Sequence, residues 1–423
     1  MLIHSASQLL TLSGGPQRGE ELGRLSIIED GAVLIRGEKI EALGRSSDLL
    51  AAFPNEPRYD ARGRVVMPGF VDPHTHAVWV GDRANEFEMR LAGKSYMEIM
   101  ATGGGIMSTV KSVRQASVEQ LIHDTRARLA AMFAHGTTTA EVKTGYGLET
   151  ASEIKQLDAI YRLNAEGPLE LEATFLGAHA IPEVYKHDPD GFTKLVINEM
   201  LPAVKVWHEQ SVPGQPLPFC DVFCEQGAFT LAQSRDILTA AKDLGFPLKI
   251  HADEFENLGG ASLAAELGAA SADHLVKTSE ADIKRLGESN TVSVALPCTP
   301  FGLAEREYTP AKQILAAGGT LAVATDINPG TAWCESMQFV LALACRYLRL
   351  TPGQAIAAAT INAAAAVNRS DSIGSLEPGK QADLLILSVD DYRMLGYRFG
   401  TNLVDTVVKR GQFYPVKEMR GSL

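Results

Sequence analysis

The sequence is poor in cysteine, in long apolar runs and in clustered positive charge. Its five cysteines stand at irregular spacings without a CxxC pair, so neither a disulfide framework nor a cysteine zinc site is expected. No apolar run reaches the length of a membrane span, and the N-terminus lacks the basic start and long apolar centre of a signal peptide. A formal net charge of −12 argues against a nucleic-acid surface. We therefore expect a cytoplasmic protein that binds neither membranes nor nucleic acid.

The two ends of the chain both carry the pattern of short β-strands. With 423 residues, 45% of them hydrophobic, the chain can bury one large domain and one smaller one. Residues 32–44 alternate like a hairpin with a turn near Gly37, and residues 374–390 and 402–414 give apolar, β-rich runs broken by Pro-Gly and Arg-Gly turns. This arrangement predicts a small β domain built from both chain ends.

The centre of the chain alternates strands and helices. Eight runs fit strands, at residues 69–76, 138–147, 171–180, 220–226, 248–254, 271–275, 291–297 and 320–326. Helices fit between most of them, for example after the capping pair Ser117 and Gln120 and after the similar pair Thr351 and Gln354. Eight such units predict an α/β fold, a (β/α)8 TIM-type barrel over residues 67–366, with residues 1–66 and 367–423 forming the β domain. A doubly wound open sheet is the alternative.

Polar residues follow the predicted strands at the ends where barrel enzymes place their active sites. His74 and His76 come first, in VDPHTHA, and if this segment is still a strand their imidazoles point to the same side. Later strands end in the same way, with His179, Glu225, His251, Glu254, His274 and Asp326. The repeated position after an apolar run predicts one site rather than scattered histidines.

Four of these residues suit a catalytic metal. His74, His76, His251 and Asp326 supply the nitrogen and oxygen ligands of a zinc or iron site. Such a metal lowers the pKa of its water to roughly 7, and either Glu254 or His274 could then move the proton.

Three further residues carry weaker signals. Arg83 follows the metal strand, where its guanidinium could bind a carboxylate through two parallel hydrogen bonds, although an ordinary surface arginine is the alternative. Tyr146 stands between two glycines, as in a loop that closes on a small ligand. Lys143 could be a modified ligand or a Schiff-base lysine, but the second strand offers neither role an obvious partner.

The motifs VDPHTHAVWVGDRANEF, KTGYGLE, FLGAHA, HADEF, SADHL and TDINPGTAW resemble the amidohydrolase superfamily and, within it, the imidazolonepropionase family. The resemblance covers nearly the whole chain. It implies a (β/α)8 barrel with a small β-sandwich domain from both termini, and a homodimer. It also implies hydrolysis of the ring amide of 4-imidazolone-5-propanoate to N-formimino-L-glutamate in histidine degradation, with one divalent or trivalent metal per subunit, zinc or iron.

The same resemblance assigns roles residue by residue. His74, His76, His251 and Asp326 match the metal ligands. The expected reaction is attack of metal-bound hydroxide on the ring carbonyl, with Glu254 as the base, His274 polarising the carbonyl, and Asp326 or His274 passing a proton to the leaving nitrogen. Positions matching substrate contacts are Arg83, Tyr146, His179, Glu254 and Thr331, and those matching product contacts are Asn328 and Gly330.

One departure from the wider superfamily favours a single metal. Two-metal members carry a carboxylated lysine at the end of the fourth strand, where this chain has Glu225. Two other functions stay open: a single-metal deaminase of heterocyclic bases, and a catalytically inactive barrel that serves as a binding module. Arg83 and Tyr146 suit a substrate with a carboxylate and disfavour the first, and the complete ligand set disfavours the second.

Overall fold

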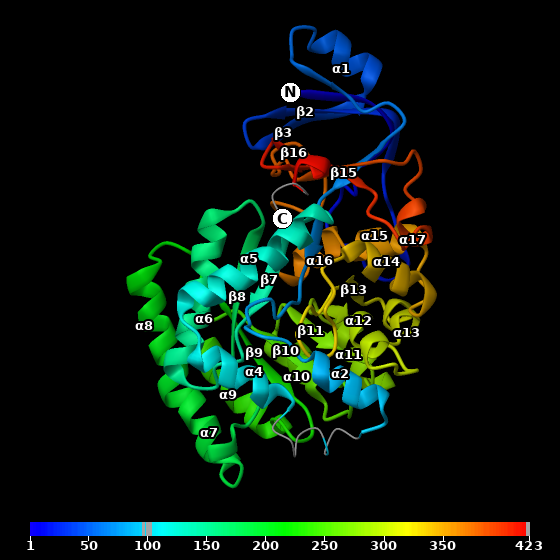
Figure 1. Cartoon of the computed structure of the whole chain (residues 1–423). Coiled ribbons are helices and arrows are strands. Elements are labelled where there is room, and N and C mark those ends of the chain that lie inside the picture. The colour runs from blue at the N-terminus through cyan, green and yellow to red at the C-terminus, as the bar shows by residue number, and fades with distance from the viewer. Residues whose placement is uncertain (95–97, 99–103, 420–423) are drawn as a thin grey trace.

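The computed structural model describes residues 1–94, 98 and 104–419, and it contains two eight-stranded sheets. One sheet forms a barrel surrounded by helices, and the other lies across one end of it (Figure 1). Among the described residues, no helix is both long and apolar enough to cross a membrane.

All eight predicted central strands are present, and they run parallel in chain order around the barrel. Their bounds are β6 (Phe70–Asp72), β7 (Thr137–Lys143), β8 (Glu170–Ala178), β9 (Phe219–Cys224), β10 (Lys249–Ala252), β11 (Ser271–His274), β12 (Val292–Ala295) and β13 (Thr320–Val323). Each strand pairs with its neighbour in sequence, as a barrel requires. The barrel prediction is confirmed, and the open doubly wound sheet is excluded.

The barrel closes between β6 and β13 through Asp72 at the end of β6 and through residues that follow the two strands. The Asp72 carboxylate accepts from the backbone N–H of Thr325 at 3.1 Å and from its hydroxyl at 2.5 Å. Beyond it, Asp326 N donates to His74 O at 3.1 Å and His76 N donates to Ile327 O at 2.9 Å. The prediction that the His-x-His motif lies on a strand was therefore wrong in detail: β6 ends at Asp72, and pairing with the far end of the chain keeps the motif extended.

Helices cover the outside of the barrel. The one predicted after Ser117 is present, with the Ser117 side chain accepting from Gln120 N and with Leu121, Leu129 and Phe133 buried. The capping pair Thr351 and Gln354 is also confirmed. The described helices after β6 are α2 (Ala84–Leu91), α4 (Ile106–Gln115), α5 (Val118–Ala134), α6 (Thr150–Glu166), α7 (Pro189–Leu195), α8 (Leu201–Ser211), α9 (Leu231–Asp243), α10 (Gly260–Leu267), α11 (Glu280–Glu288), α12 (Cys298–Gly302), α13 (Ala311–Ala316), α14 (Met337–Arg346), α15 (Pro352–Ala358) and α16 (Ile361–Ala366), with short turns of other helix types at Glu183–Tyr185 and Val196–Met200.

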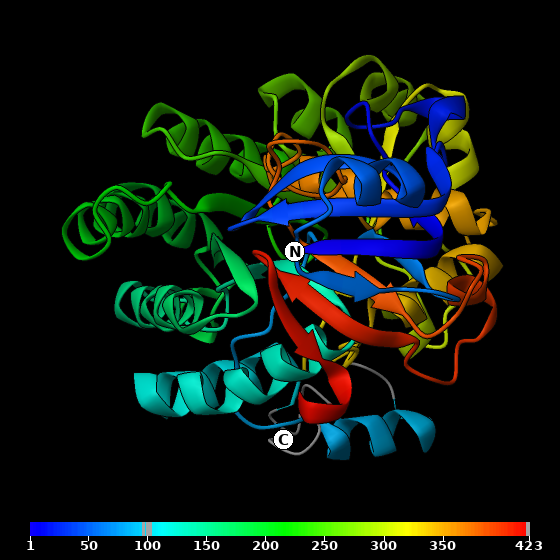
Figure 2. The ribbon, with the colours of Figure 1, turned by 90° about the horizontal axis from the view of Figure 1, so that it is seen from above.

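The second sheet combines both ends of the chain, as the sequence predicted. In Figure 2 its blue N-terminal and red C-terminal strands lie side by side over the barrel. The order is β16-β15-β14-β5-β1-β2-β3, with β4 also paired to β1. The bounds are β1 (Leu2–Leu10), β2 (Ile27–Arg36), β3 (Lys39–Arg45), β4 (Arg58–Asp60), β5 (Val65–Pro68), β14 (Leu384–Leu387), β15 (Val404–Lys409) and β16 (Gln412–Pro415), accompanied by α1 (Ser46–Ala52), α17 (Met394–Tyr397), α18 (Val416–Met419) and a 3-10 turn at Gly19–Glu21.

An apolar cluster of its own stabilises this terminal sheet. Ile3 and Val33 from the first strands pack with Leu384 and Val408 from the last ones, all with no exposed surface. Because neither end of the chain can bury these side chains alone, the sheet forms only when both ends meet. The predicted boundary after residue 66 falls within β5, and the boundaries stay a prediction.

The terminal sheet is joined to the start of β8 by five charged side chains, here called the joint network: Glu170, Arg369, Asp383, Lys409 and Arg410. Lys409 Nζ lies between Glu170 Oε2 at 2.8 Å and Asp383 Oδ2 at 2.7 Å. Arg369 and Arg410 donate to Glu170 Oε1 at 3.1 and 3.0 Å. Burial opposes ionisation of Glu170, but the charges of Lys409 and Arg369 outweigh it and hold the pKa of this carboxyl well below its usual range.

Candidate active site

The predicted metal ligands meet at the carboxyl ends of the barrel strands, at the end away from the terminal sheet. His74, His76, His251 and Asp326 are each at most 3% exposed. Three residues beside the site adopt the left-handed backbone region, with φ of +57° at Asp253, +78° at His274 and +54° at Asp326. This conformation is costly for residues other than glycine and tends to occur where a side chain must be aimed at a functional site.

Three spacings among four side-chain atoms match those of neighbouring ligands in a tetrahedral metal site. His74 Nε2 and His76 Nε2 lie 3.4 and 3.5 Å from Asp326 Oδ1, and His76 Nε2 lies 3.3 Å from His251 Nε2. Bonds of about 2.0–2.1 Å to a central ion separate neighbouring tetrahedral ligands by about 3.3–3.4 Å. His74 Nε2 and Asp326 Oδ1 are also buried without a hydrogen-bond partner, as atoms awaiting a metal would be. The residues present therefore fit one metal ion.

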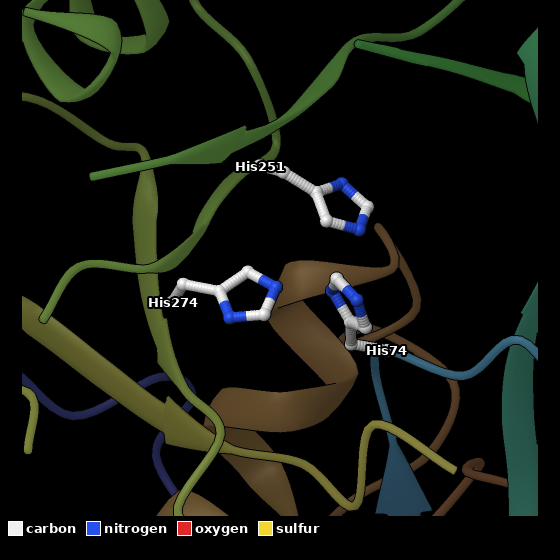
Figure 3. Close-up of side chains that lie close together, drawn as sticks. All are labelled: His74, His251 and His274. Carbon is white, nitrogen blue, oxygen red and sulfur yellow. The ribbon is translucent and has the colours of Figure 1, made fainter. Parts of the chain in front are cut away.

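His274 lies beside this group. Figure 3 shows the imidazoles of His74, His251 and His274 turned toward a common space, and one nitrogen of each lies within 4.8 Å of the others. The three contacts of 3.3–3.5 Å that join His74, His76, His251 and Asp326 do not include His274. Its position suits a side chain that reaches a ligand next to the metal.

The electrostatics favour neutral imidazoles. Burial lowers the pKa of His74, of His76 and of His274 well below the usual value for histidine. Neutral imidazole is the form that binds a metal. On the opposite side, the Thr299 hydroxyl donates to Asp326 Oδ2 at 2.5 Å, which leaves Oδ1 facing the histidines.

Two of the three candidate histidine ligands have a carboxylate behind them. His74 Nδ1 is hydrogen-bonded to Asp273 Oδ2 at 2.6 Å, and His251 Nδ1 lies 2.9 Å from Asp221 Oδ2. Such carboxylates fix the tautomer of the ring and turn the other nitrogen to the metal. His76 differs, since among the described residues its carboxylate contact is that of Nε2 with Asp326. The atoms His76 Nδ1, His251 Nδ1 and Asp221 Oδ2 are all buried without a hydrogen-bond partner, so the 2.9 Å approach of His251 to Asp221 is a close contact without hydrogen-bond geometry.

Lys143 lies beneath these carboxylates, fully buried. Its Nζ is 2.6 Å from Glu141 Oε1, 2.8 Å from Asp221 Oδ2 and 3.8 Å from Asp273 Oδ2. Burial lowers the pKa of Lys143, but the charges of Asp221 and Glu141 outweigh it and raise the pKa above its usual value, so this lysine is a cation. We call these four residues (Lys143, Glu141, Asp221 and Asp273) the inner network.

Glu254 and Glu225 have different surroundings. Glu254 is 11% exposed, and its Oε2 lies 3.6 Å from His274 Nδ1. Burial, followed by the charges of Asp326 and Glu225, raises the pKa of Glu254 well above its usual value, as expected of an acid that exchanges protons near neutral pH. The Glu225 carboxylate instead accepts from the backbone N–H groups of Gln226, Phe255 and Glu256 at 2.8–3.1 Å, which holds the loop after β10.

Arg83 lies against the loop of residues 328–331. A Cβ added at Gly330 would lie 2.5 Å from Arg83 Nη1, so glycine at this position makes room for the guanidinium. Arg83 Nε donates to Thr109 Oγ1 at 3.0 Å. Arg83 and Gly330 line a cavity of about 380 Å³ together with Thr331 and Trp333.

The Asn328 side chain organises this loop internally. Its Nδ2 donates to Asp326 O at 2.7 Å and to Thr331 Oγ1 at 3.0 Å, while its Oδ1 accepts from the N–H groups of Gly330 and Thr331, both at 2.8 Å. Because its amide group is engaged in the loop, Asn328 links the backbone of Asp326 to Gly330 and Thr331, which lie beside Arg83.

Tyr146 and His179 form the opposite wall. Tyr146 is 3% exposed, and its ring lies 5.5 Å from that of His179, which stacks at 4.9 Å on His76. Burial lowers the pKa of His179 to about 3, so this ring is neutral. The loop is held by Glu153, whose carboxylate accepts from the N–H groups of Gly145, Gly147 and Leu148.

The structure thus brings the predicted site residues to one end of the barrel, in two walls around the four candidate ligands. Sequence reasoning missed Glu141, Asp221, Asp273 and Thr299, and it found no partner for Lys143. A usable signal existed, because Glu141, Asp221 and Asp273 are acidic residues inside predicted barrel strands, where an unpaired charge would be costly.

Comparisons with known proteins agree with this picture. The model of the amidohydrolase family matches residues 223–413, and that of the bacterial imidazolonepropionase-like composite domain matches residues 31–55. The imidazolonepropionase of Herpetosiphon aurantiacus is 51% identical over 411 residues, covering 97% of this chain and 96% of that protein. That of Chloroflexus aggregans is 48% identical over 422 residues, covering 99% of each.

Solved structures share the fold at much lower identity. E. coli guanine deaminase superposes with a TM-score of 0.70 at 17% identity, covering 98% of each chain. An adenosine deaminase of Xanthomonas campestris with bound zinc gives 0.69 at 18% identity, covering 100% of this chain and 98% of that one. These similarities support the barrel with its added sheet and do not favour deamination.

Proposed function

The chain belongs to the imidazolonepropionase family of amidohydrolases, and we propose that its buried His/Asp cluster performs that family's reaction, the metal-dependent hydrolysis of 4-imidazolone-5-propanoate to N-formimino-L-glutamate in histidine degradation. The observation that carries this proposal is the set of 3.3–3.5 Å contacts among His74, His76, His251 and Asp326. These four side chains would hold one zinc or iron ion. When bound, such an ion acts as a Lewis acid and makes hydroxide available near neutral pH.

The chain's own residues would then divide the remaining work. Glu254 would take the proton of the attacking water at its carboxylate, because burial raises the pKa of this carboxyl and so makes the carboxylate a stronger base. His274, neutral because burial lowers its pKa, would donate a hydrogen bond to the ring carbonyl. Asp326 or His274 would pass a proton to the leaving ring nitrogen.

Arg83 would bind the propanoate tail of the substrate. A fixed guanidinium binds a propanoate carboxylate with two parallel hydrogen bonds, and Gly330 leaves the space in which this guanidinium lies. Tyr146 and His179 would pack against the opposite side of the ring, with Thr331 at the cavity wall. Because Asn328 is engaged in its own loop, we propose that this loop contacts the product mainly through its backbone and Thr331.

The proposal is tested by the turnover of freshly generated 4-imidazolone-5-propanoate, followed by ultraviolet absorbance, with metal content measured on the same sample. Rapid loss of substrate with about one metal per chain is the expected result, and elemental analysis then decides between zinc and iron. Absence of turnover in metal-loaded protein would overturn the proposal, and ammonia release from purines and pyrimidines would be assayed next. The homodimer and the cytoplasmic location stay predictions.

A further inference from the structure

Lys143 has no role in the reaction proposed above, yet its surroundings are unusual. The side chain has no exposed surface and lies among three carboxylates that are likewise fully buried. Burying a charge costs several kcal/mol unless partners compensate it, so a buried lysine is expected to serve a structural or functional role. The carboxylates that contact Lys143 in turn contact three of the four candidate metal ligands or their backbone.

The first connection runs through Asp221. Lys143 Nζ lies 2.8 Å from Asp221 Oδ2, and the same oxygen lies 2.9 Å from His251 Nδ1. One carboxylate oxygen thus stands between the ammonium and the imidazole. A shift of Asp221 would change the direction in which His251 presents Nε2.

The second and third connections reach the His-x-His segment. Asp273, at 3.8 Å from Lys143 Nζ, holds His74 Nδ1 at 2.6 Å. The Glu141 carboxylate lies 2.6 Å from Nζ. It accepts hydrogen bonds from the backbone N–H of Thr75 at 3.2 Å and from the Thr174 hydroxyl. Since Thr75 separates His74 from His76, Glu141 fixes the backbone that carries both imidazoles.

We propose that Lys143 is a positioning residue for the metal site: its ammonium holds Asp221, Asp273 and Glu141 in place, and through them it orients His251, His74 and the His74–His76 backbone for one metal ion. The inference rests on the proposed metal site, but not on the identity of the substrate. It differs from a ligand or Schiff-base role, since Lys143 touches carboxylates rather than the reacting centre.

The contacts predict a graded effect. Of the two connections that end at an imidazole, that of His251 is the shorter, at 2.8 Å from Nζ to Asp221, and that of His74 is the longer, at 3.8 Å from Nζ to Asp273. Among the described residues, the carboxylate contact of the His76 ring is with Asp326 and not with a partner of Lys143, so this ring serves as an internal reference. Loss of Lys143 should therefore disturb His251 most, His74 less and the ring of His76 least.

The test compares Lys143→Met with the matched control Lys409→Met. Lys409 is also a buried lysine between two carboxylates, at 2.8 and 2.7 Å, but it lies in the joint network at the other end of the barrel. Zinc affinity is measured by competition with a chelator, and imidazole tautomers by nitrogen-15 NMR of the metal-free proteins. We expect Lys143→Met to lose 10- to 100-fold in zinc affinity, as when other partners of metal-binding histidines are removed, and to lose the single tautomer of His251. Lys409→Met should bind zinc within about twofold of the parent and keep the tautomers, because no ligand depends on it.

A second variant separates positioning from charge compensation. Lys143→Met combined with Glu141→Gln removes one charge of each sign, and it should recover unfolding temperature relative to Lys143→Met without recovering zinc affinity or the His251 tautomer. Full recovery of zinc affinity in the double variant, or parent-like affinity in Lys143→Met, would overturn the inference.

If neither variant folds, Asp221→Asn is measured instead. A change in the tautomer of His251 with that of His74 unaltered supports the connection through Asp221, and equal changes at both rings contradict it. A parent protein that binds no zinc would count against the proposed function itself.

Discussion

Two buried charge networks lie at opposite ends of the same barrel, and they serve different purposes. The inner network of Lys143, Glu141, Asp221 and Asp273 lies under the candidate metal ligands, while the joint network around Glu170 and Lys409 ties the terminal sheet to β8. Both use a lysine between carboxylates. Near the first, ligand atoms such as His74 Nε2 and Asp326 Oδ1 have no hydrogen-bond partner, whereas no buried side-chain atom of the joint network is left unpaired among the residues described.

The difference shows how chemistry and stability are separated in this fold. Buried polar atoms without partners are costly, and two of them, His74 Nε2 and Asp326 Oδ1, lie where a metal ion would satisfy them. At the other end every charge has a partner, as expected of a structural contact. Perturbing the barrel end that carries the candidate metal ligands should therefore change activity and metal binding first. Perturbing the end beside the terminal sheet should change stability first.

Removing the metal should give the largest effect. Chelation should abolish turnover, and adding back zinc or iron should restore it, since the nucleophile depends on the ion. The unfolding temperature should fall as well, because a ligand that binds only the folded state stabilises it. Turnover that survives with less than one metal per ten chains would contradict the proposed site.

Replacing Glu254 should give the second largest loss of activity. Glu254→Gln keeps the shape of the side chain but cannot take a proton, so kcat should fall by about 10²–10⁴-fold. Metal content should stay at that of the parent, because Glu254 is not among the four candidate ligands. Near-normal kcat would remove Glu254 from the mechanism.

Arg83→Met should weaken substrate binding more than the chemical step. The loss of a charge-assisted contact to the propanoate should raise KM by about 10- to 100-fold, corresponding to about 1.5–3 kcal/mol, with a smaller change in kcat. Gly330→Ala should act in the same direction, because the added Cβ would displace the Arg83 guanidinium. Steady-state kinetics on both variants provide the check, and an unchanged KM in Arg83→Met would exclude the carboxylate contact.

The smallest effect on activity is expected at the joint network, where pH provides the probe. The pKa of Glu170 lies below its unfolded value of about 4.3, so its ion pairs stabilise the fold above that pH and lose this contribution as the pH falls further. Glu170→Gln should cost about 2–3 kcal/mol at pH 7, and the difference from the parent should shrink below about pH 4. Denaturant unfolding at several pH values measures it, with kcat at pH 7 as the control. A pH-independent difference would contradict the ion-pair origin.

Local patterns in the sequence were sufficient for the barrel and for the place of the site. Most of the eight strands are short, largely apolar runs, and His179, Glu225 and Asp326 follow such strands directly or within three residues. The hairpin of β2 and β3 followed from alternation and a Gly37 turn. These features depend on residues near one another in the chain, so they can be read without the tertiary structure.

Contacts between distant residues could not be read in this way. The strand expected at His74 and His76 ends at Asp72, and pairing with Asp326 and Ile327, some 250 residues away, keeps the motif extended. Glu141 lies two residues before Lys143 on β7, but the other partners of Lys143, Asp221 and Asp273, come from β9 and β11. Nothing in the pattern of one strand shows which side chain of another it will meet.

The sequence by itself determined the fold class, the joining of both chain ends into one sheet, and which histidines and carboxylates stand at the catalytic end, because hydrophobic periodicity and strand ends are local properties. Only the tertiary structure decided how those side chains are held: the contacts of Asp221 and Asp273 behind the imidazoles, the central place of Lys143, and the closed loop of Asn328. The physical reason is that a buried charge is stable only when its partners surround it, and those partners come from strands that meet only when the barrel closes.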